Sequence, residues 1–312
     1  LMQETVVFHD LGLAIVDEQH RFGVHQRLAL RDKGAGVDRV PHQLVMTATP
    51  IPRTLAMAAY ADLDVSAIDE LPPGRTPVQT VALSAERRPE LVERIRAACA
   101  EGRQAYWVCT LIDDSDEVVA QAAQTTYEAL SASLPELRVA LVHGRMKAAD
   151  KQATMRRFKE GEADLLVATT VIEVGVDVPN ASLMIIENAE RLGLAQLHQL
   201  RGRVGRGATA SSCVLMYQPP LSAMARHRLA TMRETNDGFV IAEKDLELRG
   251  PGELLGTRQT GLAAFRVADL ARDAGLLPQV HALAERLLAE DPSIADRVIH
   301  RWVGGAARYA SA

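Results

Sequence analysis

Two neighbouring carboxylates, Asp17 and Glu18, directly follow the apolar run at residues 13–16. An aspartate at the end of a strand can hold Mg²⁺, directly or through water, and the glutamate beside it can orient and deprotonate an attacking water. This chemistry is typical of a nucleotide hydrolase, but a surface acid pair at a strand end would give the same pattern. Asp69 and Glu70 illustrate the alternative, because they also follow a strand-like run and have no supporting motif.

The segment MTATP strengthens the catalytic interpretation, because it places Thr47 and Thr49 at the end of the next strand-like run. In a parallel sheet, the carboxyl ends of neighbouring strands meet at one edge, where ligands bind. We therefore expect the two hydroxyls to lie beside Asp17 and Glu18 and to link the acid pair to groups across a cleft. A hydrogen-bonded turn is the simpler alternative.

A third motif, ATTVIEVGVDVP at residues 168–179, follows a later strand-like run. Thr169 and Thr170 could meet backbone phosphates or a nucleotide. Gly175 permits close approach of the backbone, and Asp177 could accept a hydrogen bond from a ribose hydroxyl or from an arginine. The segment is therefore a candidate for contact with a nucleotide or a nucleic-acid backbone.

The most specific motif is QLRGRVGR, at residues 199–206. Its spacing predicts that Arg203 and Arg206 share one face of a helical turn. Gly202 and Gly205 should keep that turn slim enough to lie against a ligand. Two convergent arginines can stabilise the charge on a γ-phosphate from across a cleft, and an arginine finger contributes about 10³–10⁵ in rate. Pairing with local acids is the alternative.

These motifs need elements that position them, and strand-like runs alternate with helix-like runs along the chain. The alternation predicts an α/β fold with parallel sheets flanked by helices. Residues 78–217 contain a complete domain of this kind, whereas residues 1–70 contain only the last part of another, and 71–77 form a linker. Strands are predicted at 13–18, 43–50, 65–70, 78–83, 104–109, 138–143, 163–170, 181–188 and 211–217, and helices at 86–102, 117–134, 147–161, 195–203, 221–235 and 239–249.

Composition limits the class of protein. The chain of 312 residues is 47% apolar and 24% charged, which is ordinary for a globular protein of two or three domains. A net charge of −5 argues against general attraction to nucleic acid but permits a local basic groove. No run of residues resembles a membrane span or a secretory signal. Cys99, Cys109 and Cys213 form no CxxC pair, so we expect small buried side chains of a reducing cytosol.

In this order, Asp-Glu-x-His, Thr-Ala-Thr and Gln-x-x-Gly-Arg-x-Gly-Arg resemble motifs II, III and VI of superfamily 2 helicases, and TTVIEVGVDVPNA resembles their motif V. The resemblance implies RecA-like domains that hold ATP between them and grip DNA across both lobes. It implies Mg²⁺ at Asp17, Glu18 as the base and His20 as a link between the ATP and DNA sites. Arg203 and Arg206 would be the arginine fingers. The assisting and coupling residues would be Gln199, Gly175, Asp177, Thr47, Thr49, Thr169 and Thr170.

Residues 238–261, GFVIAEKDLELRGPGELLGTRQTG, resemble the helical hairpin and loop of the translocation motif shared by the RecG and Mfd families. In that motif, a hairpin moved by the ATP cycle levers a loop along duplex DNA. A glycine-rich surface loop is the alternative. Gln19 and the C-terminal tail favour RecG over the transcription-repair coupling factors of the Mfd family. The polar residues that match the motif are Arg249, Glu253, Arg258 and Gln259.

The RecG resemblance implies a motor that remodels double-stranded and branched DNA, such as stalled forks and Holliday junctions, in recombination and repair. It would be a monomer in the bacterial cytoplasm, associated with the nucleoid. The expected domains are the end of a first RecA-like domain (1–75), a second RecA-like domain (76–218), the hairpin with its translocation loop (219–262) and a helical C-terminal region (263–312).

The five lysines are not followed by Ser or Thr, so the chain contains no Gly-Lys-Ser/Thr phosphate loop. We therefore expect a fragment that is inactive alone. Its residues 1–70 should expose apolar strand edges and promote aggregation. A non-catalytic module that binds DNA or a partner protein is the alternative.

Overall fold

The computed structural model describes residues 3, 5–18, 33, 41–47, 64, 66–68, 70, 75–110, 116–169, 178–207, 209–249 and 273–302. The chain forms two compact units. Unit 1 contains Leu1–Ser66 and Ala242–Ala312, and unit 2 contains Ala67–Ile241.

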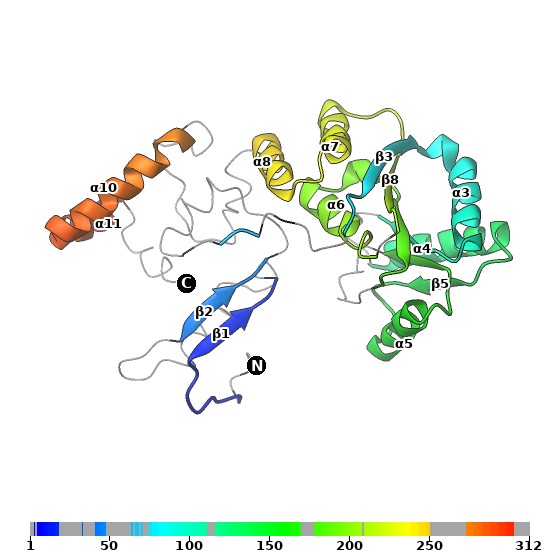
Figure 1. Ribbon diagram of the computed structural model, residues 1–312, viewed down its shortest axis with the longest axis horizontal. Coiled ribbons are helices and arrows are strands. Elements are labelled where there is room, and N and C mark those ends of the chain that lie inside the picture. Colours follow the sequence, from blue (N-terminus) through cyan, green and yellow to red (C-terminus); the bar gives the residue numbers. More distant parts are fainter. Residues whose placement is uncertain are drawn as a thin grey trace. The chain divides into compact units, whose positions relative to one another are not determined.

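A parallel sheet forms the centre of unit 2, with β3 beside β8 (Figure 1). Its strand order in the described residues is β3-β8-β7-β4-β6-β5. The central strands β4, β6 and β7 are buried at every position, as expected for a parallel sheet that is covered on both faces. The predicted α/β fold is thereby confirmed for unit 2. The strands are β3 (Gln79–Ser84), β4 (Gln104–Cys109), β5 (Val139–Val142), β6 (Leu165–Thr169), β7 (Ala181–Ile186) and β8 (Ser212–Tyr217).

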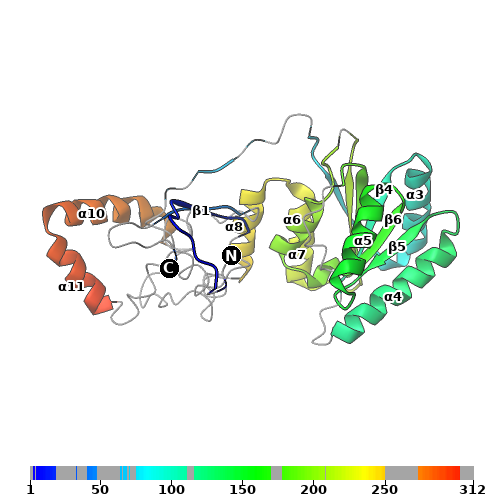
Figure 2. The same ribbon diagram turned by 90° about the horizontal axis from the view of Figure 1, so that it is seen from below.

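Helices cover both faces of this sheet (Figure 2). On one face, Leu91 and Leu130 pack around Trp107 of β4 within the main apolar core. Tyr106 points to the other face, where its ring meets Phe158 edge-on with 5.0 Å between the ring centroids. The first face carries α3 (Arg88–Ala100) and α4 (Asp116–Ser133), and the second carries α5 (Ala148–Lys159).

Three more helices follow β7 in the sequence. These are α6 (Leu194–Arg201), α7 (Ala223–Glu234) and α8 (Gly238–Arg249), with the short 3₁₀ turn η3 (Ala189–Arg191) before α6. The C-terminal half of α6 contacts Thr80 of β3, which alternates with the core residue Val81, so α6 lies on the same face as α5. Asp237 caps α8, because its Oδ1 accepts the amide of Phe239 at 2.8 Å.

Unit 1 contains a parallel pair of strands, β1 (Leu13–Val16) and β2 (His42–Val45). On β1, Ala14 and Val16 are buried, whereas Leu13 and Ile15 are 53% and 58% exposed. One face of β1 is therefore apolar and exposed among the described residues. Unit 1 also contains η4 (Ala274–Leu276), α10 (Leu277–Glu290) and α11 (Pro292–Trp302), which fits the predicted helical C-terminal region.

Several predicted elements differ from the structure, and the predicted strands at 13–18 and 43–50 end at Val16 and Val45. The run at 65–70 is not a strand in its described residues, and Ile68 is 91% exposed. Alternation alone does not make a strand, because the backbone needs a neighbour to pair with. The predicted helix at 195–203 ends at Arg201. In the described part of the chain, no helix is both long enough and apolar enough to cross a membrane.

Candidate functional site

The acid pair of unit 1 lies at the edge of the β1–β2 sheet. Val16 is opposite Val45, and the amide of Met46 donates to the carbonyl of Val16 at 2.7 Å. Asp17 and Glu18 follow the end of β1, and Thr47 lies just past the end of β2. The backbones of these three residues therefore lie at the same end of the strand pair, whereas His20 and Thr49 lie outside the described residues.

Glu18 has an unusual backbone. Its φ is 54°, in the left-handed region that side chains other than glycine rarely occupy. Its amide donates to Asp17 Oδ1 at 2.8 Å. Asp17 is exposed and Glu18 is half-buried. Non-glycine residues in sparsely populated backbone regions cluster at functional sites, so this conformation supports a chemical role for Glu18.

The arginine motif of unit 2 is a loop and not one helical face, contrary to prediction. The helix ends at Arg201, and Gly205 has φ +77°, which turns the chain out of the helix before Arg206. A Cβ at Gly205 would lie 2.7 Å from Val78 Cγ2. A Cβ at Gly207 would lie 2.5 Å from the Pro179 carbonyl oxygen. The loop is thus packed against the segments that precede β3 and β7, at the amino ends of those strands.

Gly202 follows α6 and provides a shared backbone acceptor. A Cβ at this position would meet only ordinary contacts of 3.4 Å within the chain. The carbonyl of Gly202 accepts from Arg206 Nε and from an Arg75 guanidinium nitrogen, each at 3.3 Å. Arg75 belongs to the segment predicted as a simple linker, and a lone arginine among prolines was the available signal.

The three residues of the motif that were predicted to act on a ligand differ in exposure: Gln199 and Arg203 are half-buried and Arg206 is exposed. Arg206 can therefore reach a ligand outside the domain. Arg203 and Arg206 are three residues apart in the same loop. Their guanidinium groups are the type of side chain expected to bind a phosphate.

Arg201, which the sequence did not single out, is the most buried arginine of the motif, with 3% of its surface exposed. Its guanidinium donates to the carbonyls of Met232 and Thr235 at 2.9 and 2.8 Å. It also contacts His198 Nδ1 at 3.2 Å. Burial, followed by the charge of Arg201, lowers the pKa of His198 to about 4, so the ring is neutral at pH 7 and accepts this hydrogen bond.

A polar cluster lies at the carboxyl ends of β4, β6 and β7. Thr110 Oγ1 donates to the carbonyl of Glu187, and Asn188 adopts the left-handed region with φ 46°. Thr169 is 2% exposed, and its hydroxyl has no partner among the described residues. In this conformation Thr169 is therefore enclosed, and the predicted contact with a phosphate would fall to Thr170, which lies outside the described residues.

The same edge contains a buried carboxylate. Glu187 is 8% exposed and pairs with Arg88 at 2.6 Å, and the Arg88 guanidinium lies 4.8 Å from the ring centroid of Trp107. This cation–π contact and ion pair hold the start of α3 on the sheet.

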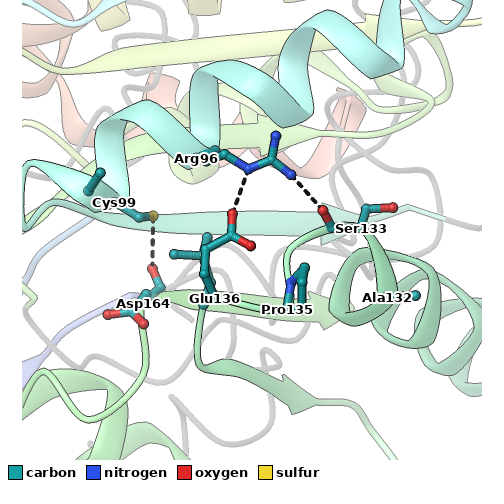
Figure 3. A pocket seen from close by; sticks show the side chains of 9 residues that line it. Arg96, Cys99, Ala132, Ser133, Pro135, Glu136 and Asp164 are labelled. Carbon is teal, nitrogen blue, oxygen red and sulfur yellow. Dashed lines mark hydrogen bonds and ion pairs between the residues drawn. The ribbon is translucent and has the colours of Figure 1, made fainter.

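A cavity of about 720 Å³ lies at the opposite, amino edge of the sheet, between the ends of α3 and α4 (Figure 3). Arg96 crosses it to Glu136 at 2.5 Å and to the Ser133 carbonyl at 2.7 Å. Cys99 lines it, and burial raises the pKa of this thiol to about 11. An arginine held by its own neighbours and an unreactive thiol give this cavity no catalytic chemistry. Cys109 and Cys213 are also buried and unpaired, as predicted.

No group of three or more His, Cys, Asp or Glu side chains suited to a metal occurs in the described residues. Arg249 is the last residue of α8. The remaining predicted site residues lie outside the described residues; they are Gly175, Asp177, Glu253, Arg258 and Gln259.

Two family models match this chain. Residues 88–208 match the helicase conserved C-terminal domain, and residues 235–300 match the C-terminal part of domain 3 of the ATP-dependent DNA helicase RecG. The chain is 66% identical over 313 residues to the ATP-dependent DNA helicase RecG of Escherichia coli strain K12, covering 100% of this chain and 45% of that protein. The RecG of Pasteurella multocida is 67% identical over 304 residues, with 97% and 44% covered.

A solved structure agrees with these relatives. RecG bound to a three-way DNA junction matches with a TM-score of 0.67 and 48% identity, covering 89% of this chain and 35% of that one. The chain thus spans less than half the length of the curated relatives described above.

Proposed function

We infer that this chain, which belongs to the RecG family of ATP-dependent DNA helicases, forms part of a motor that couples ATP hydrolysis to movement on branched DNA. One observation carries the proposal, namely the similarity to RecG that extends along the whole chain. The local geometry supports it, because the acid pair meets Thr47 at a sheet edge and the arginine loop presents an exposed Arg206.

In the proposed mechanism, Glu18 orients and deprotonates the water that attacks ATP. Asp17 fits Mg²⁺, because this ion is usually held by one or two carboxylates together with water and substrate phosphates, and needs no cluster of ligands. Bound there, Mg²⁺ would neutralise phosphate charge. Asp17 is exposed, and one of its oxygens accepts the adjacent amide of Glu18.

Arg203 and Arg206 are proposed to stabilise the charge that develops on the γ-phosphate, with Gln199, Gly175 and Asp177 assisting. Packing at Gly205 and the shared Gly202 carbonyl hold the loop that carries both arginines. His20, Thr47, Thr49 and Thr170 are proposed to couple the nucleotide to DNA.

Movement along duplex DNA is proposed for the hairpin and loop at residues 219–262, through Arg249, Glu253, Arg258 and Gln259. The match of residues 235–300 to the RecG model favours this family over the transcription-repair coupling factors. We propose residues 1–75 as the end of a first RecA-like domain, 76–218 as the second and 263–312 as a helical C-terminal region. A monomeric cytoplasmic motor associated with the nucleoid is part of the same proposal.

The test is ATP-dependent unwinding of a labelled three-way junction by the full-length protein. We expect strand separation with ATP and none with a non-hydrolysable analogue. Equal separation in both would mean passive melting, and no separation with ATP, by a protein that binds the junction, would reject the helicase assignment.

A further inference from the structure

The interior of unit 2 contains a polar connection between the arginine motif and the helical hairpin. Arg201 is the last residue of α6, immediately before the loop of Arg203 and Arg206. Its side chain leaves that helix and donates to the carbonyls of Met232, in the last turn of α7, and Thr235, just after it. These carbonyls belong to a helix end, where backbone acceptors have no partner within the helix.

The connection continues to the start of α8. The amide of Asp237 donates to Thr235 Oγ1 at 3.0 Å, and Asp237 Oδ1 accepts the amides of Phe239 and Val240 at 2.8 and 3.5 Å. Thr235 is therefore held by Arg201 on one side and holds the N-cap of α8 on the other. A shift of α6 would move the residue that fixes where α8 begins.

A buried arginine is an energetically unfavourable means of joining two helices. Removing a guanidinium from water is unfavourable, and apolar residues of similar volume pack at least as well. The acceptors here are two carbonyls, the Thr80 hydroxyl at 3.4 Å and the neutral His198 ring. The planar guanidinium of Arg201 has five donors in a fixed geometry and can bond these acceptors together. Because its hydrogen bonds are directional, it fixes the orientation of α7 relative to α6 as well as their separation.

We propose that Arg201 is a positioning residue that couples the arginine loop to the helical hairpin by holding the hinge at Thr235 and, through it, the Asp237 cap of α8. The proposal rests on the function inferred above. It assigns no contact with ATP or DNA to Arg201.

The test compares two exposed N-caps of the same hairpin in the full-length protein. Asp237→Ala removes the cap of α8, at the end of the proposed connection. Ser222→Ala removes the cap of α7, where Ser222 Oγ accepts the amide of Ala225 at 3.1 Å, and lies outside the connection. Ser222→Ala removes one capping bond, and Asp237→Ala removes one at 2.8 Å and a longer one at 3.5 Å, so both should lower thermal stability by a similar amount.

We expect Asp237→Ala to keep junction-stimulated ATP hydrolysis within about twofold. The unwinding per ATP should fall by roughly fivefold, which corresponds to the usual loss of stabilisation when an N-cap is removed. Ser222→Ala should change neither quantity. Equal effects of the two variants on unwinding per ATP, or parallel loss of hydrolysis and unwinding in Asp237→Ala, would overturn the coupling role. An inactive wild-type protein would instead overturn the proposed function, and the coupling role with it.

A second variant tests the connection at its origin. Arg201→Lys keeps the charge, but a single ammonium cannot reach all four acceptors. We expect faster hydrogen exchange at the amides of Phe239 and Val240, with the amide of Ala225 unchanged. Unchanged exchange in the first turn of α8 would contradict the proposal, and this readout does not depend on catalysis.

Discussion

Val16 of β1 lies opposite Val45 of β2 in a parallel register. The strands therefore end together, and the acid pair that follows one strand stands level with the threonine that follows the other. This relationship distinguishes Asp17 and Glu18 from Asp69 and Glu70, whose preceding residues form no strand in the described part of the chain.

The first prediction concerns the proposed base. Glu18→Gln removes the group that accepts a proton and keeps its shape, so ATP hydrolysis by the full-length protein should fall by about 10²–10⁴. Binding of a fluorescent ATP analogue should persist. Glu70→Gln, the same change at an exposed glutamate, is the matched control and should leave turnover unchanged. Equal rates in the two variants would remove Glu18 from the mechanism.

The second prediction concerns the arginine loop. Arg206 is exposed, so Arg206→Ala should fold normally and lower ATP turnover by about 10³-fold or more. Affinity for a three-way junction, measured by fluorescence anisotropy, should remain within a small factor of wild type. Arg156→Ala, at an exposed arginine of α5, should have no effect on turnover. Near-normal hydrolysis by Arg206→Ala would show that the loop supplies no finger.

Much of unit 2 was predictable because its strands are continuous apolar runs and its helices end at clear signals. Gly102 and Gly161, for example, terminate their helices with φ of +80° and +78°. The strand β4 matched its predicted bounds at both ends. The local sequence pattern is enough to predict such strands, because a continuous apolar run fits a central strand that is buried on both faces of the sheet.

The site was less predictable because its geometry depends on contacts distant in sequence. Nothing near Gly205 indicates that Val78 occupies the space of its missing Cβ. The same holds for Arg75, whose acceptor Gly202 lies 127 residues away along the chain, and for Arg201, whose acceptors Met232 and Thr235 lie 31 and 34 residues away. The i, i+3 spacing of the two arginines suggested a helical face, but the positive φ of Gly205 interrupts it.

A third prediction tests the packing of the arginine loop. Gly205→Ala adds a Cβ 2.7 Å from Val78 Cγ2 at a positive φ, so both strain and overlap should lower the free energy of unfolding, by about 2–4 kcal/mol. Gly102→Ala has a similar φ of +80° and open space around its Cβ, and should cost only about 1–2 kcal/mol.

The measurement for these glycine variants is urea unfolding followed by the fluorescence of Trp107, which is fully buried, in a Trp302→Phe background. The difference between the two variants isolates the steric contribution. A loss at Gly205 no larger than that at Gly102 would show that Val78 moves aside freely.

A fourth prediction concerns pH. Because the pKa of His198 is lowered to about 4 in the folded protein, the unfolded chain binds a proton below about pH 6.5 that the folded chain does not. This contribution to stability is therefore complete above pH 6.5 and falls as pH decreases to 4, by up to about 3 kcal/mol. His198→Gln, which keeps an acceptor for Arg201, should remove this part of the pH dependence.

The matched control for the pH experiment is His227→Gln, at an exposed histidine of α7. Its unfolding free energy, measured by urea titration between pH 4 and 7, should parallel that of wild type. If His198→Gln also parallels wild type, His198 is not held neutral in the folded state.

The most direct test of the central claim is the rate of ATP hydrolysis by the full-length protein with and without a three-way DNA junction. We predict turnover that the junction strongly stimulates and that Glu18→Gln and Arg206→Ala each abolish. Turnover that is independent of the junction, or that survives in both variants, would contradict it.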